Sequence, residues 1–150
     1  MNGDVLLIEA GARLCALPMA QVVETMRPLA VDPIANAPPF VAGLSLIRGR
    51  PVPVVLLEVL LAGKADSEPR RWVTLRVGSR MVALAVGRVV GTRRDSELEL
   101  EGIPPLLSDA ASEAIEALGR LDQQLLVLLK TARVVPEEIW GWIATLGESE

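Results

Sequence analysis

The feature of this 150-residue sequence that most constrains its fold is an internal repeat. When the chain is shifted by 67 positions, the segment from Val5 to Thr25 aligns with the segment from Trp72 to Thr92 without a gap. The identical pairs are Gly11/Gly78, Arg13/Arg80, Ala16/Ala83, Leu17/Leu84, Val22/Val89, Val23/Val90 and Thr25/Thr92. A repeat of this length indicates that the two halves of the chain build similar structural units.

Each copy of the repeat predicts a β-hairpin. An apolar run leads into a short turn, Gly11-Ala12-Arg13 or Gly78-Ser79-Arg80, and a second apolar run follows. Glycine suits such a turn because it adopts a positive φ without steric cost. A second shared pattern spans Leu44 to Leu61 and Leu118 to Val135: an apolar stretch, a polar turn, a strand-like run and a short helical piece.

These patterns predict a single domain over residues 1–150, with β-rich halves at roughly 1–64 and 68–135. Two small barrels packed on each other would satisfy the repeat, because closure removes the exposed edges of apolar strands. A C-terminal helix is expected over 136–146, where proline, two acids and helically spaced apolar residues follow one another. The Ala- and Glu-rich segment from Ser108 to Leu118 also has the propensity of a helix.

The composition argues against catalysis. The chain has no histidine, which removes the usual general base and the usual metal ligand. Its single cysteine, Cys15, lies in an apolar run typical of a buried core residue. The acids Glu97, Glu99 and Glu101 alternate as one solvated face of an extended segment rather than as a metal site. We expect no enzyme activity, no metal and no cofactor.

Charge and hydropathy predict a soluble, cytoplasmic protein. The net charge of −4 and the 3% aromatic content argue against nucleic-acid binding. No apolar run reaches the roughly 18 to 20 residues that a membrane span needs, so no membrane insertion is expected. The start of the chain, MNGDVLLIEAG, lacks the basic region of a signal peptide.

The stretch FVAGLSLIRGRPVPVV, from Phe40 to Val55, interrupts two apolar runs with an arginine and a glycine. Gly43 and Gly49 are expected to be backbone residues, at a bulge or a turn with positive φ. Two prolines, at positions 51 and 53, lack an N–H and share one side of an extended strand, which favours an edge or irregular strand. The arginine, Arg48, fits either a solvated turn or a displayed interface anchor.

The segment IANAPPFVAGLSLIRGRPVPVVLL resembles the central signature of the CheW-like domain family. The matching positions are Asn36, Pro38, Phe40, Gly43, Arg48, Gly49, Pro53 and Leu57. The resemblance covers about residues 4 to 136. It implies a mainly β fold of two intertwined five-stranded SH3-like β-barrels with a short C-terminal helix, and it favours a strand over Ala114 to Leu118 against the helical propensity. It also implies a non-enzymatic adaptor of chemotaxis-type signalling, which couples the cytoplasmic tip of a chemoreceptor to the regulatory domain of a CheA-type histidine kinase.

Within this resemblance, the predicted partner-binding residues are Arg48, Glu24, Val22 and Val86. Glu24 is expected to pair with Arg48 and hold it in one pose. Val22 and Val86 fit core positions better than contact positions, and contact a partner only if they are exposed. Gly43, Gly49 and Pro53 are expected to shape the loop that presents Arg48.

The sequence departs from the usual family pattern at several polar or glycine positions. Leu46 replaces a common asparagine, Leu56 a common aspartate, Gly87 a frequent aspartate and Ala117 a usual glycine. These departures motivate an alternative function, as a scaffold of another motility or surface-sensing pathway. A small-barrel module that binds nucleic acid or a small ligand is a further alternative.

Overall fold

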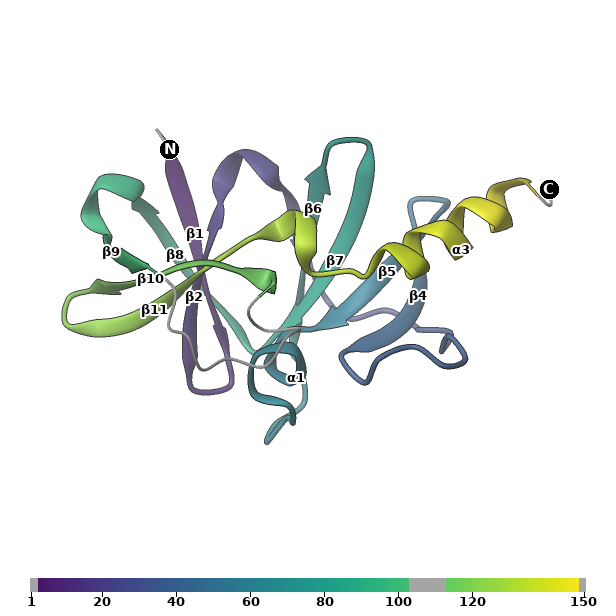
Figure 1. The fold of residues 1–150 in the computed structure, drawn as a ribbon, viewed down its shortest axis with the longest axis horizontal. Helices are drawn as coiled ribbons and strands as arrows, with labels where there is room; N and C mark the ends of the chain where they lie inside the picture. The colour runs from purple at the N-terminus through teal and green to yellow at the C-terminus, as the bar shows by residue number, and fades with distance from the viewer. Residues whose placement is uncertain (1–2, 103–112, 149–150) are drawn as a thin grey trace.

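The computed structural model describes residues 3–102 and 113–148, and within them the protein is mainly β (Figure 1). Its strands form two sheets. The six-stranded sheet has the order β8-β1-β2-β11-β10-β9. Its strands are β1 (Asp4–Ala10), β2 (Arg13–Pro18), β8 (Arg88–Arg94), β9 (Glu99–Gly102), β10 (Ile115–Leu121) and β11 (Gln124–Leu129).

The five-stranded sheet has the order β3-β6-β7-β5-β4. Its strands are β3 (Val22–Met26), β4 (Val41–Ile47), β5 (Arg50–Leu56), β6 (Arg71–Val77) and β7 (Arg80–Val86). The helical segments are α1 (Leu57–Ala62), α3 (Glu137–Glu148) and the short 3-10 turns η1 (Met19–Gln21), η2 (Asp95–Glu97) and η3 (Thr131–Arg133). The C-terminal helix α3 extends along the outside of the molecule beyond β4 and β5 (Figure 1).

The two halves of the repeat exchange hairpins. The hairpin β1–β2 from the first half joins strands of the second half, and the hairpin β6–β7 from the second half joins β3, β4 and β5. Each exchanged hairpin is held by one parallel pairing, β2 with β11 and β7 with β5. The predicted intertwined, mainly β fold with two sheets and a C-terminal helix is confirmed.

The more detailed expectation of two closed five-stranded barrels is not confirmed, because among residues 3–102 and 113–148 strand pairing closes neither sheet and one sheet has six strands. The extra strand is β9, which pairs with β10. The matching place in the other sheet holds a single bridge between Asp32 and Leu44. The sheets therefore follow one plan, and they differ in how far their outermost segment is extended.

The turns follow the repeat closely. Gly11 and Gly78 adopt φ values of 63° and 65° in two-residue turns, which confirms the predicted hairpins. In the second hairpin of each half, both turn residues have positive φ, as a type I′ turn requires. These pairs are Arg48-Gly49 and Asp122-Gln123.

Apolar side chains from both sheets and from α1 and α3 form the main core cluster, which places the sheets face to face around shared packing. Cys15 is fully buried in this cluster, as its apolar run predicts. Burial raises the pKa of its thiol to about 12. The α3 helix contributes Ile139 to the cluster, with Trp140 and Ile143 packed against it.

Two expectations of secondary structure are corrected. Of the helix expected from Ser108 to Leu118, Glu113 and Ala114 are helical, and strand β10 begins at Ile115, one residue later than the family resemblance implies, because pairing with β9 and β11 overrides local propensity. The first residues of that segment, 108–112, lie outside the described residues. The proline-containing strand β5 is not an edge strand, because it lies between β7 and β4.

Candidate functional site

The candidate site is built on the turn between β4 and β5. Arg48 occupies the first turn position with φ 51°, and Gly49 follows with φ 80°. The flanking residues Ile47 and Arg50 pair across the hairpin. A positive φ at a non-glycine residue is uncommon, and the type I′ geometry here requires it. The turn therefore displays the Arg48 side chain, which is 74% exposed.

Arg48 is held by Glu24 in β3, as the sequence predicts. Its Nε donates a hydrogen bond to Oε1 of Glu24 at 3.1 Å, and its Nη2 donates to Oε2 at 2.7 Å. The hydrogen bonds lower the pKa of the Glu24 carboxyl and raise the pKa of the Arg48 guanidinium. Because β3 and β4 are the two edge strands of the five-stranded sheet, this ion pair bridges its open edges.

The glycine Gly43 brings the preceding loop against β4. It has φ 146° beside a register shift in the pairing of β4 with β5. A Cβ at this position would collide with the backbone oxygen of Asp32, only 2.1 Å away. Asp32 and Leu44 exchange backbone hydrogen bonds of 2.8 and 2.9 Å at the same place. The expected positive φ is observed at Gly43 and Gly49, and their role in presenting Arg48 stays a prediction.

Pro51 and Pro53 lie on the part of β5 that precedes its pairing with β7. Both residues face β4 across the hairpin, at Leu46 and Leu44 respectively. The parallel pairing of β5 with β7 begins only at Val54. One side of the strand is therefore unladdered along the prolines, as expected, although β5 as a whole is an inner strand.

The two predicted valine contacts have different surroundings. Val22 opens β3, is partly buried and packs against the main core. Val86 ends β7, is 1% exposed and belongs to that core. Because its side chain is enclosed, Val86 has a packing role in this structure and offers no partner contact. The reason is that the strand exchange places β7 at the centre of its sheet.

Two departures from the family pattern lie on this hairpin, Leu46 beside the turn and Leu56 at the far end of β5. Leu46 lies on edge strand β4 and is 69% exposed, although leucine is a core-type residue. Leu56 occupies the N-cap of α1 without a side-chain hydrogen bond and packs instead against an apolar cluster beneath the five-stranded sheet. An exposed leucine two residues before Arg48 thus places an apolar contact beside a charged one.

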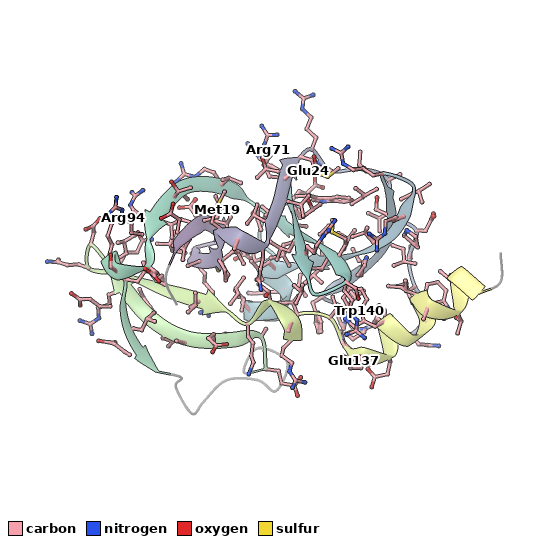
Figure 2. The ribbon with its side chains drawn as sticks, turned by 90° about the horizontal axis from the view of Figure 1, so that it is seen from above. Met19, Glu24, Arg71, Arg94, Glu137 and Trp140 are labelled. Atoms are coloured by element: carbon pink, nitrogen blue, oxygen red, sulfur yellow. The ribbon has the colours of Figure 1, made fainter. Side chains whose placement is uncertain are left out.

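A second arginine site, which the sequence reasoning missed, joins a repeat hairpin to the terminal helix. Arg80 donates from Nη1 and Nη2 to Oε1 and Oε2 of Glu137 at 2.9 and 3.1 Å. Its guanidinium also lies 4.9 Å from the ring centre of Trp140. Glu137 and Trp140 lie together at the start of α3 (Figure 2). The repeated Gly-x-Arg and the acids at the helix start were the available signals.

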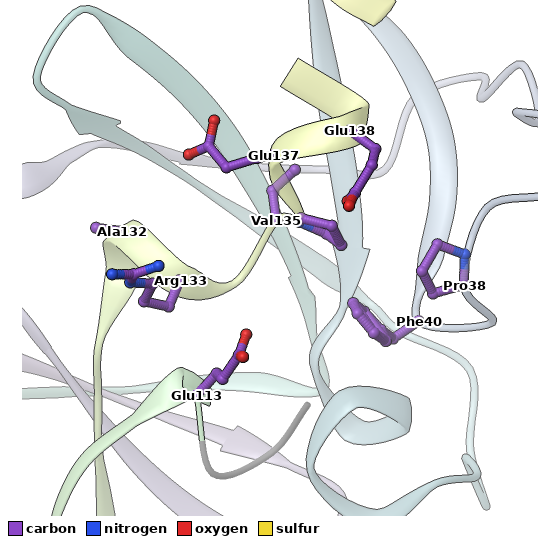
Figure 3. A pocket seen from close by; sticks show the side chains of 9 residues that line it. Pro38, Phe40, Glu113, Ala132, Arg133, Val135, Glu137 and Glu138 are labelled. Carbon is purple, nitrogen blue, oxygen red and sulfur yellow. The ribbon is translucent and has the colours of Figure 1, made fainter. Parts of the chain in front are cut away.

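The start of α3 also borders a cleft of about 500 Å³ (Figure 3). Pro38 and Phe40 of the signature segment line one side of it, and Val135 and Glu138 line the other. This cleft places the signature segment next to the C-terminal end of the family-like region.

Within the described residues, no group of three or more His, Cys, Asp or Glu side chains is arranged to hold a metal ion. None of the helices in that part of the chain is long and apolar enough to cross a membrane. The site's chemistry is that of recognition: an oriented guanidinium, an exposed leucine and nearby sheet edges.

Comparison with known proteins gives a consistent result. A family model described as "CheW-like domain" matches residues 4–138. "Protein FrzA" of Myxococcus xanthus is 32% identical over 127 residues, which cover 78% of this chain and 79% of that protein. "Chemotaxis protein CheW" of Klebsiella aerogenes is 26% identical over 121 residues, covering 79% of this chain and 73% of that protein. The crystal structure of the scaffolding protein TtCheW from Thermoanaerobacter tengcongensis shares the fold, with a TM-score of 0.71, 18% identity, and coverage of 87% of this chain and 85% of that chain.

Proposed function

The chain belongs to the CheW-like domain family, and we propose that it couples chemoreceptors to a CheA-type histidine kinase through the surface around Arg48. In this role it binds the regulatory domain of the kinase and the cytoplasmic tip of the receptor. It acts in the cytoplasm as a non-enzymatic adaptor.

The observation that carries this proposal is the geometry of Arg48. Its side chain is exposed, yet the two hydrogen bonds that it donates to Glu24 fix the plane of the guanidinium. An arginine that is already ordered loses less conformational entropy when a partner binds. The remaining N–H donors are free to meet carbonyl or carboxylate oxygens, and Leu46 adds apolar area beside them. Val22 lies two residues before Glu24 on β3 and extends the same proposed surface.

Charge reversal tests the proposal. Wild-type protein is expected to capture a CheA-type regulatory domain and a receptor-tip fragment in pull-down assays. Arg48→Glu and Glu24→Arg each weaken capture by about tenfold, because each places like charges in contact and frees the turn. The double variant restores the pair with reversed polarity and recovers part of the binding. Arg50→Glu is the matched control, because Arg50 is exposed and flanks the same turn.

The proposal fails if wild-type protein captures neither fragment and Arg48→Glu, correctly folded, behaves like wild type. No recovery in the double variant would show that the ion pair does not orient Arg48 for binding. Circular dichroism establishes that each variant keeps the β fold.

The exposed Leu46 supports one second candidate, a CheW-like scaffold serving another motility or surface-sensing pathway. A polar residue is usual at this family position, so an exposed leucine favours a partner with a matching apolar surface. A pull-down assay with the Leu46→Asn variant and a chemotaxis kinase distinguishes the two candidate functions. Binding of a chemotaxis kinase that improves in Leu46→Asn would indicate that the natural partner belongs to a different pathway.

A further inference from the structure

A cleft of about 500 Å³ lies where the two sheets meet, between edge strands β3 and β8. We call it the arginine cleft. It is lined by Thr25, Arg70, Arg71, Gly87, Arg88 and Val89. In Figure 2 the labelled Arg71 lies on the same side of the molecule as Glu24. The residues that line the cleft include neither Arg48 nor Glu24, although Thr25 directly follows Glu24 on β3.

Among the described residues, the lining of the arginine cleft carries three guanidinium groups and no carboxylate. Arg88 is bound on one side by Glu9, with Nε to Oε1 at 3.0 Å and Nη2 to Oε2 at 3.2 Å. Arg70 and Arg71 are exposed, and neither forms an ion pair within the described residues. In a chain with a net charge of −4, this local concentration of positive charge is unusual. It creates a field that attracts negative groups.

The repeat supplies an internal reference for this cleft. At the shift of 67 positions, Arg70 and Arg71 correspond to Gly3 and Asp4, and Arg88 corresponds to Gln21. The related place in the other half thus has one acid and no arginine. Arg88 has a structural partner in Glu9, whereas Arg70 and Arg71 have no ion-pair partner within the described residues and no arginine at the matching place of the repeat, which favours a binding role for these two.

We propose that the arginine cleft binds an acidic segment of a partner protein, whose glutamate or aspartate carboxylates accept hydrogen bonds from Arg70 and Arg71. This inference rests on the proposed adaptor function in one respect, which is that the partner is a signalling protein. Arginine forms bidentate hydrogen bonds with carboxylates, and this chain shows that geometry at Arg48, Arg80 and Arg88.

The surroundings favour a protein carboxylate over a nucleic acid. No aromatic side chain lines the cleft, so bases find no stacking surface. The net negative charge of the chain repels an extended polyanion, whereas a short acidic segment meets only the local field.

Fluorescence anisotropy with a labelled peptide of twelve alternating Glu and Ala residues tests this binding on the full chain. The wild-type protein is expected to bind this peptide and not the matching peptide of Gln and Ala. Arg70→Glu and Arg71→Glu each weaken binding by about tenfold, because reversed charge repels the probe. Arg76→Glu is the matched control, since Arg76 is exposed on the same strand as Arg71 and lies outside the cleft. Its effect is expected to stay below about twofold, from the change of net charge alone.

Gly87 allows a second, sterically controlled test. A Cβ at this position would lie 3.3 Å from the backbone oxygen of Glu9, so Gly87→Ala and Gly87→Asp displace the backbone alike. Only Gly87→Asp adds a carboxylate to the cleft. This variant is therefore expected to bind the acidic peptide about tenfold more weakly than Gly87→Ala does.

Three results would overturn the inference. The first is that the Gln and Ala peptide binds as tightly as the Glu and Ala peptide, and the second is that Arg71→Glu and Arg76→Glu weaken peptide binding equally. The third is that a twelve-nucleotide oligothymidine binds more tightly than the acidic peptide and that Arg71→Glu abolishes this binding. The same variants in the pull-down assay separate this inference from the adaptor proposal. If the protein binds the acidic peptide but captures neither signalling fragment, the adaptor proposal is wrong and the proposal for the arginine cleft is still supported. Capture of both fragments without any specific effect of Arg70→Glu or Arg71→Glu on the peptide defeats the cleft alone.

Discussion

The two Gly-x-Arg hairpins share one turn geometry and have different neighbours. At the first, α1 approaches so closely that a Cβ on Gly11 would lie 2.5 Å from Oε2 of Glu58. At the second, Gly78 faces open space, and Arg80 binds Glu137 and Trp140 of α3. The repeat thus sets the strand scaffold twice. The helical segment that follows each half decides which turn residue becomes a tertiary contact.

The second hairpins of the two halves show the same contrast. Gly43 and Ala117 occupy matching places, each directly after the register shift of its hairpin. The loop at Asp32 crosses Gly43 at van der Waals contact, whereas β9 crosses its hairpin at Gly119, where a Cβ would lie 2.5 Å from the Glu99 backbone oxygen. Each half therefore needs one glycine beneath its outermost segment, but at different positions.

The largest expected effect comes from exchanging residues at these matching places. Gly43→Ala should lower the free energy of unfolding by about 3 kcal/mol, because both its φ and the Asp32 backbone exclude a Cβ. Ala117→Gly should lower it by only about 0.5–1 kcal/mol, from backbone entropy. Urea unfolding measures both values. Similar losses in the two variants would show that the close approach at Asp32 does not constrain the fold.

Gly119→Ala sharpens this comparison, since it is expected to resemble Gly43→Ala rather than Ala117→Gly. If Gly43→Ala does not accumulate as folded protein, Gly119→Ala and Ala117→Gly still rank the two kinds of position. A Gly119→Ala variant as stable as wild type would show that the close approach of β9 does not require a glycine at this position.

The sequence predicts the local elements well, because hairpins depend on residues close together in the chain. Glycine turns, the terminal helix and the buried Cys15 follow from such patterns. The exchange of hairpins between halves follows only from the family resemblance, since apolar alternation is the same for either partner strand. Local propensity also fails over Ile115 to Leu118, where tertiary pairing decides the backbone.

The candidate site also contains features that the sequence predicts and features that it does not predict. The pair of Arg48 with Glu24 follows from family resemblance and charge, and the structure confirms it. Val86 could not be placed, because strand order decides whether a valine faces core or solvent. The Arg80 contacts could not be predicted, because they depend on how α3 returns to the second hairpin. That return brings together residues that are far apart in the sequence.

A smaller effect is expected from alanine at the two repeat glycines. Both have positive φ, so each substitution should lower the free energy of unfolding by about 1 kcal/mol. Gly11→Ala should lose about 1 kcal/mol more, because it displaces the Glu58 carboxylate that accepts a hydrogen bond from the Asp66 N–H. Thermal unfolding of both variants gives the difference. Adding Glu58→Ala should remove the excess, and a persistent excess would mean that Glu58 is not its cause.

The smallest expected effect separates Arg80 from its repeat counterpart Arg13. The hydrogen bonds from Arg80 lower the pKa of the Glu137 carboxyl in the folded protein. A carboxyl whose pKa is lower when folded stabilises the structure above its unfolded pKa, and this contribution disappears as the pH falls through the folded pKa. Acidification below about pH 4.5 should therefore loosen the start of α3, since the protonated carboxyl no longer holds Arg80 against the helix.

Fluorescence of Trp140 in a Trp142→Phe variant reports this loosening, because the third tryptophan, Trp72, is buried and remote in sequence from α3. Glu137→Gln should remove the acid-dependent change while unfolding at the same pH as the parent. Arg80→Ala should give the loosened spectrum already at neutral pH, whereas Arg13→Ala should leave the titration unchanged, because Arg13 forms no ion pair within the described part of the chain. An unchanged spectrum in Arg80→Ala would mean that apolar packing of Ile139 and Ile143 alone holds α3, and the two hairpins would then differ in sequence surroundings but not in function.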